Sequence, residues 1–339
     1  MMRIHPVRSF FAILGIALVT AVGACLLPEN PYQRWQLVDG TIQGRARWIY
    51  ERIHFDPRPI DVAIVGPSRI ARGVDPFRLE AELARLGHPS RVVNFAMPEG
   101  GRNMNDVVVE EMLKTKTPKL IVIGVIEKPS RFGHPAYKYL APRGLIVDPG
   151  YLTNVRYLGD LAFLPFRQMR LFVADVAPKV GGLDAGFDPA RYEGDAGIPD
   201  TFALKHGGRR STAIPASPEE LAEGVADFER GATPPILPRD QADLEFGDER
   251  HYIRRIVAAA RAKGVKVAFL SIPYYSGTDD VQESMFYRQY GEVWNGGFLA
   301  PNPNLFADYG HLTTGGAAIL TNWMAPRVAE ALAKPEPKR

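Results

Sequence analysis

Short apolar runs alternate with amphipathic stretches in two separate parts of the chain. Each run is rich in β-branched residues and predicts a strand that is buried on both faces. The predicted strands are 61–65, 91–95, 119–124 and 265–272. In the stretches between and after them, apolar side chains recur every three or four residues, which is typical of helices. The predicted helices are 75–86, 103–114, 248–263 and 314–332.

The order of these elements predicts the fold class. Strands that alternate with helices pair in parallel through right-handed crossovers, with helices on both faces of the sheet. Asp75 followed by Pro76 is a typical helix start, and Gly87 is a typical helix end. We therefore expect an α/β fold with a doubly wound, flavodoxin-like parallel sheet.

Residues 128–245 interrupt the alternation and are expected to form an insertion at the carboxyl edge of the sheet, where loops build ligand sites. Within the insertion, 151–176 is amphipathic and predicts a helix, whereas 181–243 is rich in Gly, Pro and Asp. The sequence thus predicts one domain over 59–333 that carries this insertion. The polar residues 334–339 predict a disordered tail.

The N-terminal residues have the pattern of a membrane segment. Residues 9–27 contain no charge, and as a helix they would rise about 28 Å, close to the thickness of a bilayer core. Arg3 and Arg8 precede this run, which predicts a cytoplasmic N-terminus and an extracytoplasmic, periplasmic domain. We expect a single-pass signal anchor over 1–28 in the inner membrane, followed by a stalk and lead-in helix over 29–58.

Other interpretations of this segment stay open. Small residues at Ala21, Gly23 and Ala24 are compatible with a cleaved signal peptide. Cys25 follows Val22-Gly23-Ala24, which loosely resembles a lipoprotein signal, although Leu26 and Leu27 continue the apolar run. A small apolar residue inside a membrane helix also accounts for Cys25. All three interpretations export the remainder of the chain.

Composition excludes several classes of protein. With 46% hydrophobic and 23% charged residues, the chain is globular rather than disordered. Its formal net charge of +3 is small and scattered, which argues against a nucleic-acid-binding protein. A single cysteine excludes an intramolecular disulfide, and no histidine pair has metal-ligand spacing. We expect neither a metal nor a cofactor.

Candidate chemistry begins at Ser68. The loop Gly66-Pro67-Ser68-Arg69 directly follows the first predicted strand, and ligands of open parallel sheets bind beyond the carboxyl ends of strands. A serine hydroxyl at this place is a candidate nucleophile, provided that a base activates it. A helix-capping serine is the simpler interpretation of Ser68 alone.

A candidate base lies just before the last predicted helix, in the run Asp308-Tyr309-Gly310-His311. An aspartate three residues before a histidine can accept a hydrogen bond from Nδ1–H, which leaves Nε2 free as a base. The combination predicts a triad of Ser68, His311 and Asp308. A capping or surface histidine would be the simpler interpretation if Ser68 were absent.

These two blocks together resemble the SGNH (GDSL-like) hydrolase family, in which a serine follows the first strand and a DxxH motif precedes the last helix. The resemblance covers about 60 to 130 and 245 to 333. It implies an oxyanion hole built from the Ser68 amide and from an amide at Gly100 or Gly101, which follow the second strand. The third block departs from the family, because Gly124-Val125-Ile126-Glu127 lacks the usual asparagine; Asn103 is a candidate substitute.

The layout resembles the membrane-anchored, exported subset of the family, whose members act in lipoteichoic acid D-alanylation and polysaccharide O-acetylation. It implies an acyl esterase or O-acyltransferase that acts on an acylated envelope polysaccharide or exopolysaccharide, with acetyl as the expected acyl group. It also implies a membrane-bound O-acyltransferase as partner. Arg69, Glu127 and Tyr274 are weaker candidates for substrate binding, since each follows a predicted strand closely. The departing third block motivates an alternative, a non-catalytic glycan-binding or assembly factor on a degenerate SGNH scaffold.

Overall fold

A five-stranded parallel sheet forms the centre of the computed structural model, which describes residues 6–148, 154–203, 208–231 and 235–334. The strand order is β2-β1-β3-β6-β7, and every neighbouring pair is parallel. The strands are β1 (Val62–Val65), β2 (Val92–Asn94), β3 (Leu120–Val125), β6 (Lys266–Ser271) and β7 (Glu292–Asn295). This order is compatible with a doubly wound fold, and the predicted α/β class is confirmed.

Helices cover both faces of the sheet and enclose two hydrophobic cores. Side chains alternate along β1, so that Val62 and Ile64 belong to one core and Ala63 and Val65 to the other. The helices of the first core are α4 (Ser68–Gly73), α5 (Pro76–Arg85) and α15 (Thr314–Ala333). Those of the second are α3 (Arg45–His54), α6 (Arg102–Met112) and α13 (Gly247–Ala262).

The segment expected as a stalk is part of the second core instead. It forms α2 (Pro31–Trp35) and α3, with Trp35 and Ile49 fully buried. The apolar residues of this segment form short runs that are interrupted by arginines. This pattern is why the sequence predicted a stalk rather than a part of the core. Arg34 and Arg52 are nevertheless buried, because both pair with carboxylates.

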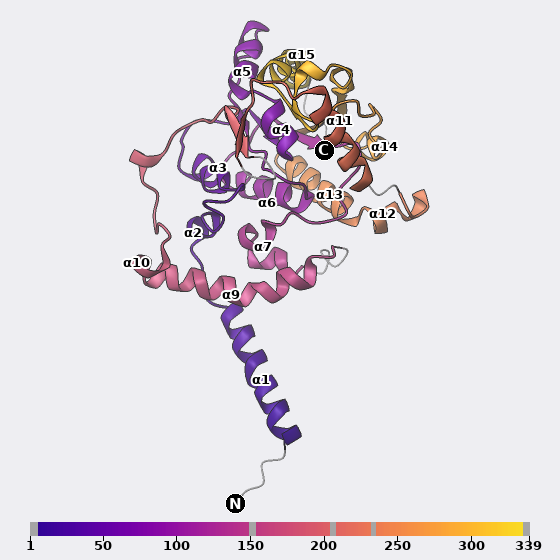
Figure 1. Cartoon of the computed structure of the whole chain (residues 1–339). Helices are drawn as coiled ribbons and strands as arrows, with labels where there is room; N and C mark the ends of the chain where they lie inside the picture. The colour runs from indigo at the N-terminus through magenta and orange to yellow at the C-terminus, as the bar shows by residue number, and fades with distance from the viewer. Residues whose placement is uncertain (1–5, 149–153, 204–207, 232–234, 335–339) are drawn as a thin grey trace, which may run out of the picture.

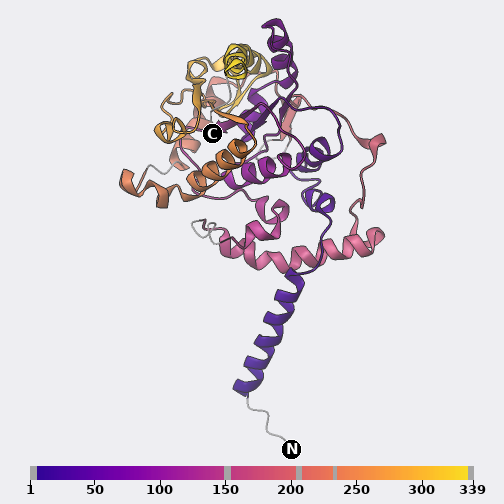
Figure 2. The same cartoon turned by 180° about the vertical axis from the view of Figure 1, so that it is seen from behind.

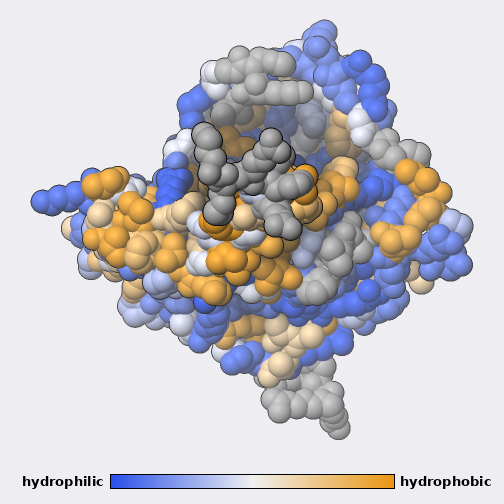
Figure 3. All heavy atoms as spheres, turned by 90° about the horizontal axis from the view of Figure 1, so that it is seen from below, coloured by the Kyte–Doolittle hydropathy of each residue, from blue (hydrophilic) through white to orange (hydrophobic). Residues whose placement is uncertain are grey.

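Helix α1 (Pro6–Cys25) projects from one end of the molecule, and helix α9 (Tyr157–Val176) lies across its base (Figures 1 and 2). In the described part of the chain, no helix combines the length and the apolarity needed to span a membrane, so the predicted transmembrane helix is not supported. Most large apolar side chains of α1 are exposed, as are Leu158, Phe166, Val173 and Val176 of α9. Figure 3 shows apolar side chains gathered on the face seen from this end.

The insertion contains short elements around α9. Most of 181–200 is irregular, whereas the remainder of the Gly-, Pro- and Asp-rich stretch 181–243 contains a hairpin and a helix that its composition did not indicate. Its helices and strands are α7 (Tyr137–Leu140), α8 (Arg143–Ile146), α10 (Pro178–Gly181), β4 (Thr201–Ala203), β5 (Arg209–Ser211), α11 (Pro218–Gly231) and α12 (Ala242–Glu245). Helix α14 (Ser284–Tyr287) lies between β6 and β7. Except for Lys334, the predicted tail lies outside the described residues.

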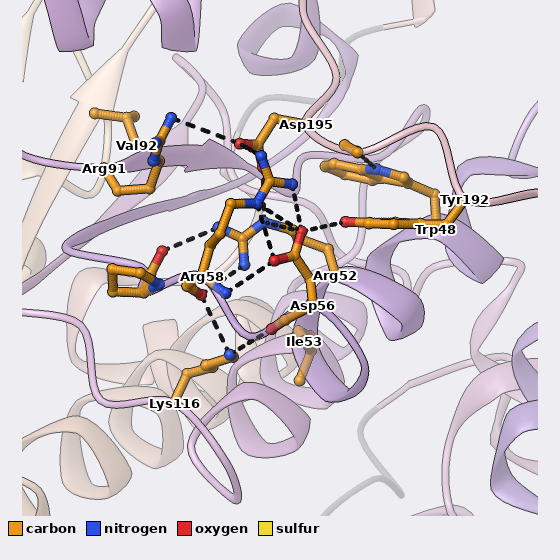
Figure 4. Close-up of polar contacts among 12 residues, drawn as sticks. Trp48, Arg52, Ile53, Asp56, Arg58, Arg91, Val92, Lys116, Tyr192 and Asp195 are labelled. Atoms are coloured by element: carbon orange, nitrogen blue, oxygen red, sulfur yellow. Dashed lines mark hydrogen bonds and ion pairs between the residues drawn. The ribbon is translucent and has the colours of Figure 1, made fainter. Parts of the chain in front are cut away.

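A buried polar cluster ties the insertion to α3 (Figure 4). The Arg52 guanidinium is fully buried and donates to Asp195 Oδ1 at 2.7 Å, and to the carbonyls of Arg58 at 3.1 Å and Pro59 at 3.0 Å. The Tyr192 hydroxyl donates to Asp56 Oδ2 at 2.8 Å. These contacts fix the segment 192–195, which leads directly into the β4–β5 hairpin.

Candidate active site

Ser68 is the first residue of α4 and lies just beyond the carboxyl end of β1. The chain leaves the strand through Gly66 and Pro67, and the extended conformation of Pro67 ends the strand before the helix starts. Ser68 is partly exposed, whereas its neighbour Arg69 is buried. The turn therefore presents the serine hydroxyl at the edge of the sheet where ligands of such folds bind.

Two glycines allow α4 to approach the strand ends this closely. A Cβ atom on Gly124, in β3, would lie 2.1 Å from Cγ1 of Ile70, and one on Gly66 would lie 2.8 Å from the same atom. Real Cβ atoms do not tolerate such contacts. The absence of side chains at both positions thus sets the depth at which α4, and with it Ser68, sits on the sheet.

Asp308 and His311 lie opposite each other in a small antiparallel hairpin formed by β8 (Phe306–Asp308) and β9 (His311–Leu312). The amide of Gly310 donates to Asp308 Oδ1 at 2.8 Å and closes the turn between them. The next residues lead into α15, whose first turn is capped by Thr313. The aspartate and the histidine are therefore fixed relative to each other by local backbone geometry.

The structure brings Ser68, His311 and Asp308 into one hydrogen-bonded chain. His311 Nε2 lies 2.8 Å from Ser68 Oγ, and His311 Nδ1 lies 2.8 Å from each carboxylate oxygen of Asp308. With the aspartate holding the proton on Nδ1, Nε2 is free to accept the proton of the serine hydroxyl. This is the arrangement that general-base activation of a serine requires.

The electrostatics of the pair suit a neutral base beside an ionised carboxylate. Burial lowers the pKa of His311, against the opposing effect of the hydrogen bond to Asp308. Burial raises the pKa of Asp308, but the hydrogen bond from His311 and the charges around it outweigh this effect and leave that pKa below its usual value. Arg72 contributes to both shifts, since its Nη1 lies 4.0 Å from Asp308 Oδ2.

Arg69, Glu127 and Tyr274 come together, and Arg69 contacts both of the other residues. Arg69 Nη1 pairs with Glu127 Oε2 at 2.6 Å, and its guanidinium lies 5.6 Å from the centre of the Tyr274 ring. Glu127 is 4% exposed, so its carboxylate is buried rather than solvated. The buried ion pair joins the start of α4 to the segment that follows β3.

Gly100, Gly101 and Asn103, which were expected to build the oxyanion hole, lie in two different environments, and none of them lines the cavity of Ser68. Gly100 and Gly101 line a small cavity of about 30 Å³ that reaches Gly66 and Pro67. Asn103 is fully buried, and its Oδ1 accepts the backbone N–H of His134 at 2.8 Å. The tight packing of Gly101 on His134 holds this loop in place. Donation from these amides to an oxyanion stays a prediction.

Ser68 opens into a cavity of about 770 Å³. Its walls come from the loop before α3, from α4, from the loop after β2 and from the β4–β5 hairpin of the insertion. Phe202 of that hairpin lies with its ring centre 6.0 Å from the His311 ring. The insertion and the expected stalk segment therefore both contribute to the site, which the interrupted pattern of their sequences did not reveal.

Sequence reasoning also missed Arg45, Arg72 and Asn94. Asn94, at the end of β2, donates from Nδ2 to the carbonyls of Ile70 and Val74, both at 3.0 Å, and so anchors α4. Arg72 lies one helical turn after Ser68, and this i, i+4 spacing was the available signal. Arg45 offered no such signal, since it reaches the cavity from a distant part of the sequence.

No group of three His, Cys, Asp or Glu side chains within the described ranges is arranged to hold a metal ion. The chain matches no model of a known protein family, and it matches no curated protein.

Proposed function

We propose that this chain is a serine acyl esterase or O-acyltransferase of the SGNH type. The observation that carries the proposal is the hydrogen-bonded chain of Ser68, His311 and Asp308 at the mouth of a cavity. Its position beyond the carboxyl end of β1 and the strand order of the sheet are both compatible with the SGNH resemblance.

The geometry supports the following reaction. Ser68 Oγ attacks an acyl carbonyl while its proton passes to His311 Nε2, and Asp308 stabilises the imidazolium that forms. His311 then returns this proton to the leaving alkoxide as the carbonyl–oxygen bond breaks, which leaves the acyl group on Ser68. Water or a sugar hydroxyl, deprotonated by His311, attacks the acyl-serine and releases the acid or a new ester.

The proposed substrate is an O-acyl group, with acetyl as the expected one, on an envelope polysaccharide or exopolysaccharide. The volume of the Ser68 cavity is in the range that suits a ligand larger than a simple acyl group. The SGNH resemblance adds a membrane-bound O-acyltransferase as the proposed partner, which would supply or receive the acyl group.

We propose further that the domain lies on the extracytoplasmic, periplasmic side of the inner membrane, to which its N-terminal segment attaches it. Helix α1 exposes apolar side chains along its length, and Phe166, Val173 and Val176 form an apolar stripe on α9 at the same end of the molecule. An apolar stripe on the exposed side of a helix suits contact with the surface of a bilayer.

One observation favours the non-catalytic alternative, a glycan-binding or assembly factor. The third-block position that carries an asparagine in the SGNH family holds Ile126, and the carboxylate of the next residue, Glu127, is engaged by Arg69. The side chain of an isoleucine has no N–H or O–H group that could donate a hydrogen bond to an oxyanion. The alternative therefore predicts a well-folded protein whose Ser68 does not react.

The test is labelling of the full-length chain with a serine-directed fluorophosphonate. We expect labelling of the wild type and its loss in Ser68→Ala and His311→Ala. Ser90→Ala is the matched control, since Ser90 precedes β2 at the opposite edge of the sheet and must leave labelling unchanged. Absence of labelling in folded wild-type protein would refute the proposal and favour the alternative.

A further inference from the structure

The cavity in front of Ser68 has an unusual charge for a site that binds neutral sugars. Among the residues that the structure describes, three arginines line it, Arg45, Arg72 and Arg209, against a single acidic residue, Glu99. Glu99 is exposed, and its Oε2 accepts a hydrogen bond from the neutral amide of Gln43 at 3.1 Å. The lining is therefore cationic, with the negative group at its rim.

Arg72 is the guanidinium nearest to the triad, and its hydrogen-bonding capacity is not used up. Its Nη1 is buried without a hydrogen-bond partner among the described residues. The nearest carboxylate oxygen is Asp308 Oδ2, at 4.0 Å, which already accepts from His311. The Phe202 ring lies under the guanidinium, at 4.1 Å from its carbon to the ring centre, and holds its plane.

Arg45 faces the same cavity from α3. One of its N–H groups donates to the carbonyl of Asn94 at 3.0 Å, and its guanidinium stacks on Trp48 at 4.6 Å. Within the described residues, neither Arg45 nor Arg209 has a carboxylate within the 4.0 Å of an ion pair, although most arginines of this domain do. Arg209 donates from Nε to the Thr201 hydroxyl at 2.9 Å, at the mouth of the cavity.

Such an arrangement has a chemical use. Guanidinium groups held flat by aromatic rings present parallel N–H donors, which match the oxygen pairs of carboxylates and phosphates. Burying a cation without a counter-charge is costly, so a buried and unpaired donor is best satisfied by an anionic ligand. The other arginines near the site, such as Arg69, are already neutralised by carboxylates of the protein.

We infer that the substrate polymer carries an anionic group, a carboxylate or a phosphate, which binds Arg72 and Arg45 while its ester lies at Ser68. The inference deepens the proposed function and rests on it for the role of Ser68. Anion binding itself does not require catalysis, and it is therefore testable on its own.

The experiment measures binding by titration calorimetry to the full-length Ser68→Ala protein, in which no turnover occurs. The probes are a hexamer of galacturonate, a short glycerol phosphate oligomer and the neutral glucose hexamer, all at one ionic strength. We expect the galacturonate hexamer, the phosphate oligomer or both to bind at least about tenfold more tightly than the glucose hexamer. The probe that binds more tightly identifies the anionic group as a carboxylate or a phosphate.

Variants locate the binding. Arg72→Gln and Arg45→Gln, each added to Ser68→Ala, should weaken binding of the anionic probe by about tenfold or more. The matched control is Arg85→Gln, which removes an exposed arginine of α5 and must leave binding unchanged. Circular dichroism spectra that match the parent show that each variant is folded.

The results separate the two proposals. Equal binding of neutral and anionic oligomers, or anion binding that survives both cavity variants, would overturn the inference even if wild-type Ser68 reacts with the fluorophosphonate. Conversely, the wild-type Ser68 could fail to react while the anionic probe binds tightly and depends on Arg72. This result would support the inference of an anionic ligand and refute only the proposed esterase or O-acyltransferase activity.

Discussion

Replacement of Arg52 by alanine should loosen the wall of the proposed active site from a distance. Arg52 is fully buried and joins α3 to Asp195 of the insertion, and it also satisfies two backbone carbonyls (Figure 4). The alanine leaves the two carbonyls without these donors and removes one partner of Asp195, whose side chain is only 9% exposed. The segment that it frees continues directly into the β4–β5 hairpin that carries Phe202.

The size of the effect follows from these contacts. Breaking a buried ion pair costs about 3–5 kcal/mol. Asp195 keeps a second partner, since Arg58 Nη1 lies 2.8 Å from its Oδ2, which places the loss near the lower limit, about 3 kcal/mol. At about 2 °C per kcal/mol for a large domain, the melting temperature of Arg52→Ala should fall by roughly 6 °C.

The assay combines thermal unfolding, followed by circular dichroism, with hydrogen exchange over 189–203. We expect faster exchange in that segment together with the lower melting temperature. Arg85→Ala is the matched control, because Arg85 is 69% exposed and its ion pair with Glu82 should contribute less than about 1 kcal/mol. If Arg52→Ala were as mild as Arg85→Ala, the buried cluster would not be what holds the insertion on α3.

Three further predictions concern the site. Asp308→Asn should lower acyl turnover on the order of 10⁴-fold with little loss of stability, since the amide favours the wrong tautomer of His311; normal turnover would exclude the triad. Gly124→Ala should displace α4 and reduce fluorophosphonate labelling, and Ile70→Ala in the same chain should restore part of it, because the added methyl group collides with Ile70. Burial lowers the pKa of His134 from 6.5 to about 4. Between these two pH values the folded state therefore binds fewer protons than the unfolded state. Urea unfolding should therefore show stability that is full above pH 6.5 and falls by up to about 3 kcal/mol towards pH 4, and His134→Gln should flatten this dependence.

The parts of the fold that the sequence predicted correctly are those with strong local patterns. Strands β1 and β3 are continuous apolar runs, and α5 carries its own Asp75 cap and Pro76. The edge strand β7 was missed, because an edge strand with one solvated face needs few apolar residues and Glu292–Asn295 has only two. A short strand of this kind is defined by its pairing with β6 rather than by its own composition.

The site shows the same division between local and distant information. Asp308 and His311 are three residues apart, so their contact is local. Ser68 could be predicted to meet them because it directly follows a strand. The pairing of Arg69 with Glu127 and the arrival of Arg45 at the cavity depend on how distant segments pack. Charge alone does not tell which arginines are neutralised inside the protein and which remain for a ligand.

Because Asp308 and His311 lie on one hairpin, the triad is divided between two structural units, and one hydrogen bond of the triad joins them. The acid and the base belong to one rigid unit, β8–β9, and the nucleophile belongs to another, α4. Within the triad, the contact between His311 Nε2 and Ser68 Oγ is the one that crosses from one unit to the other. A shift of the hairpin by little more than a bond length would therefore break the hydrogen bond to Ser68 while His311 and Asp308 stay paired. The reactivity of Ser68 thus depends on the distance between His311 Nε2 and Ser68 Oγ.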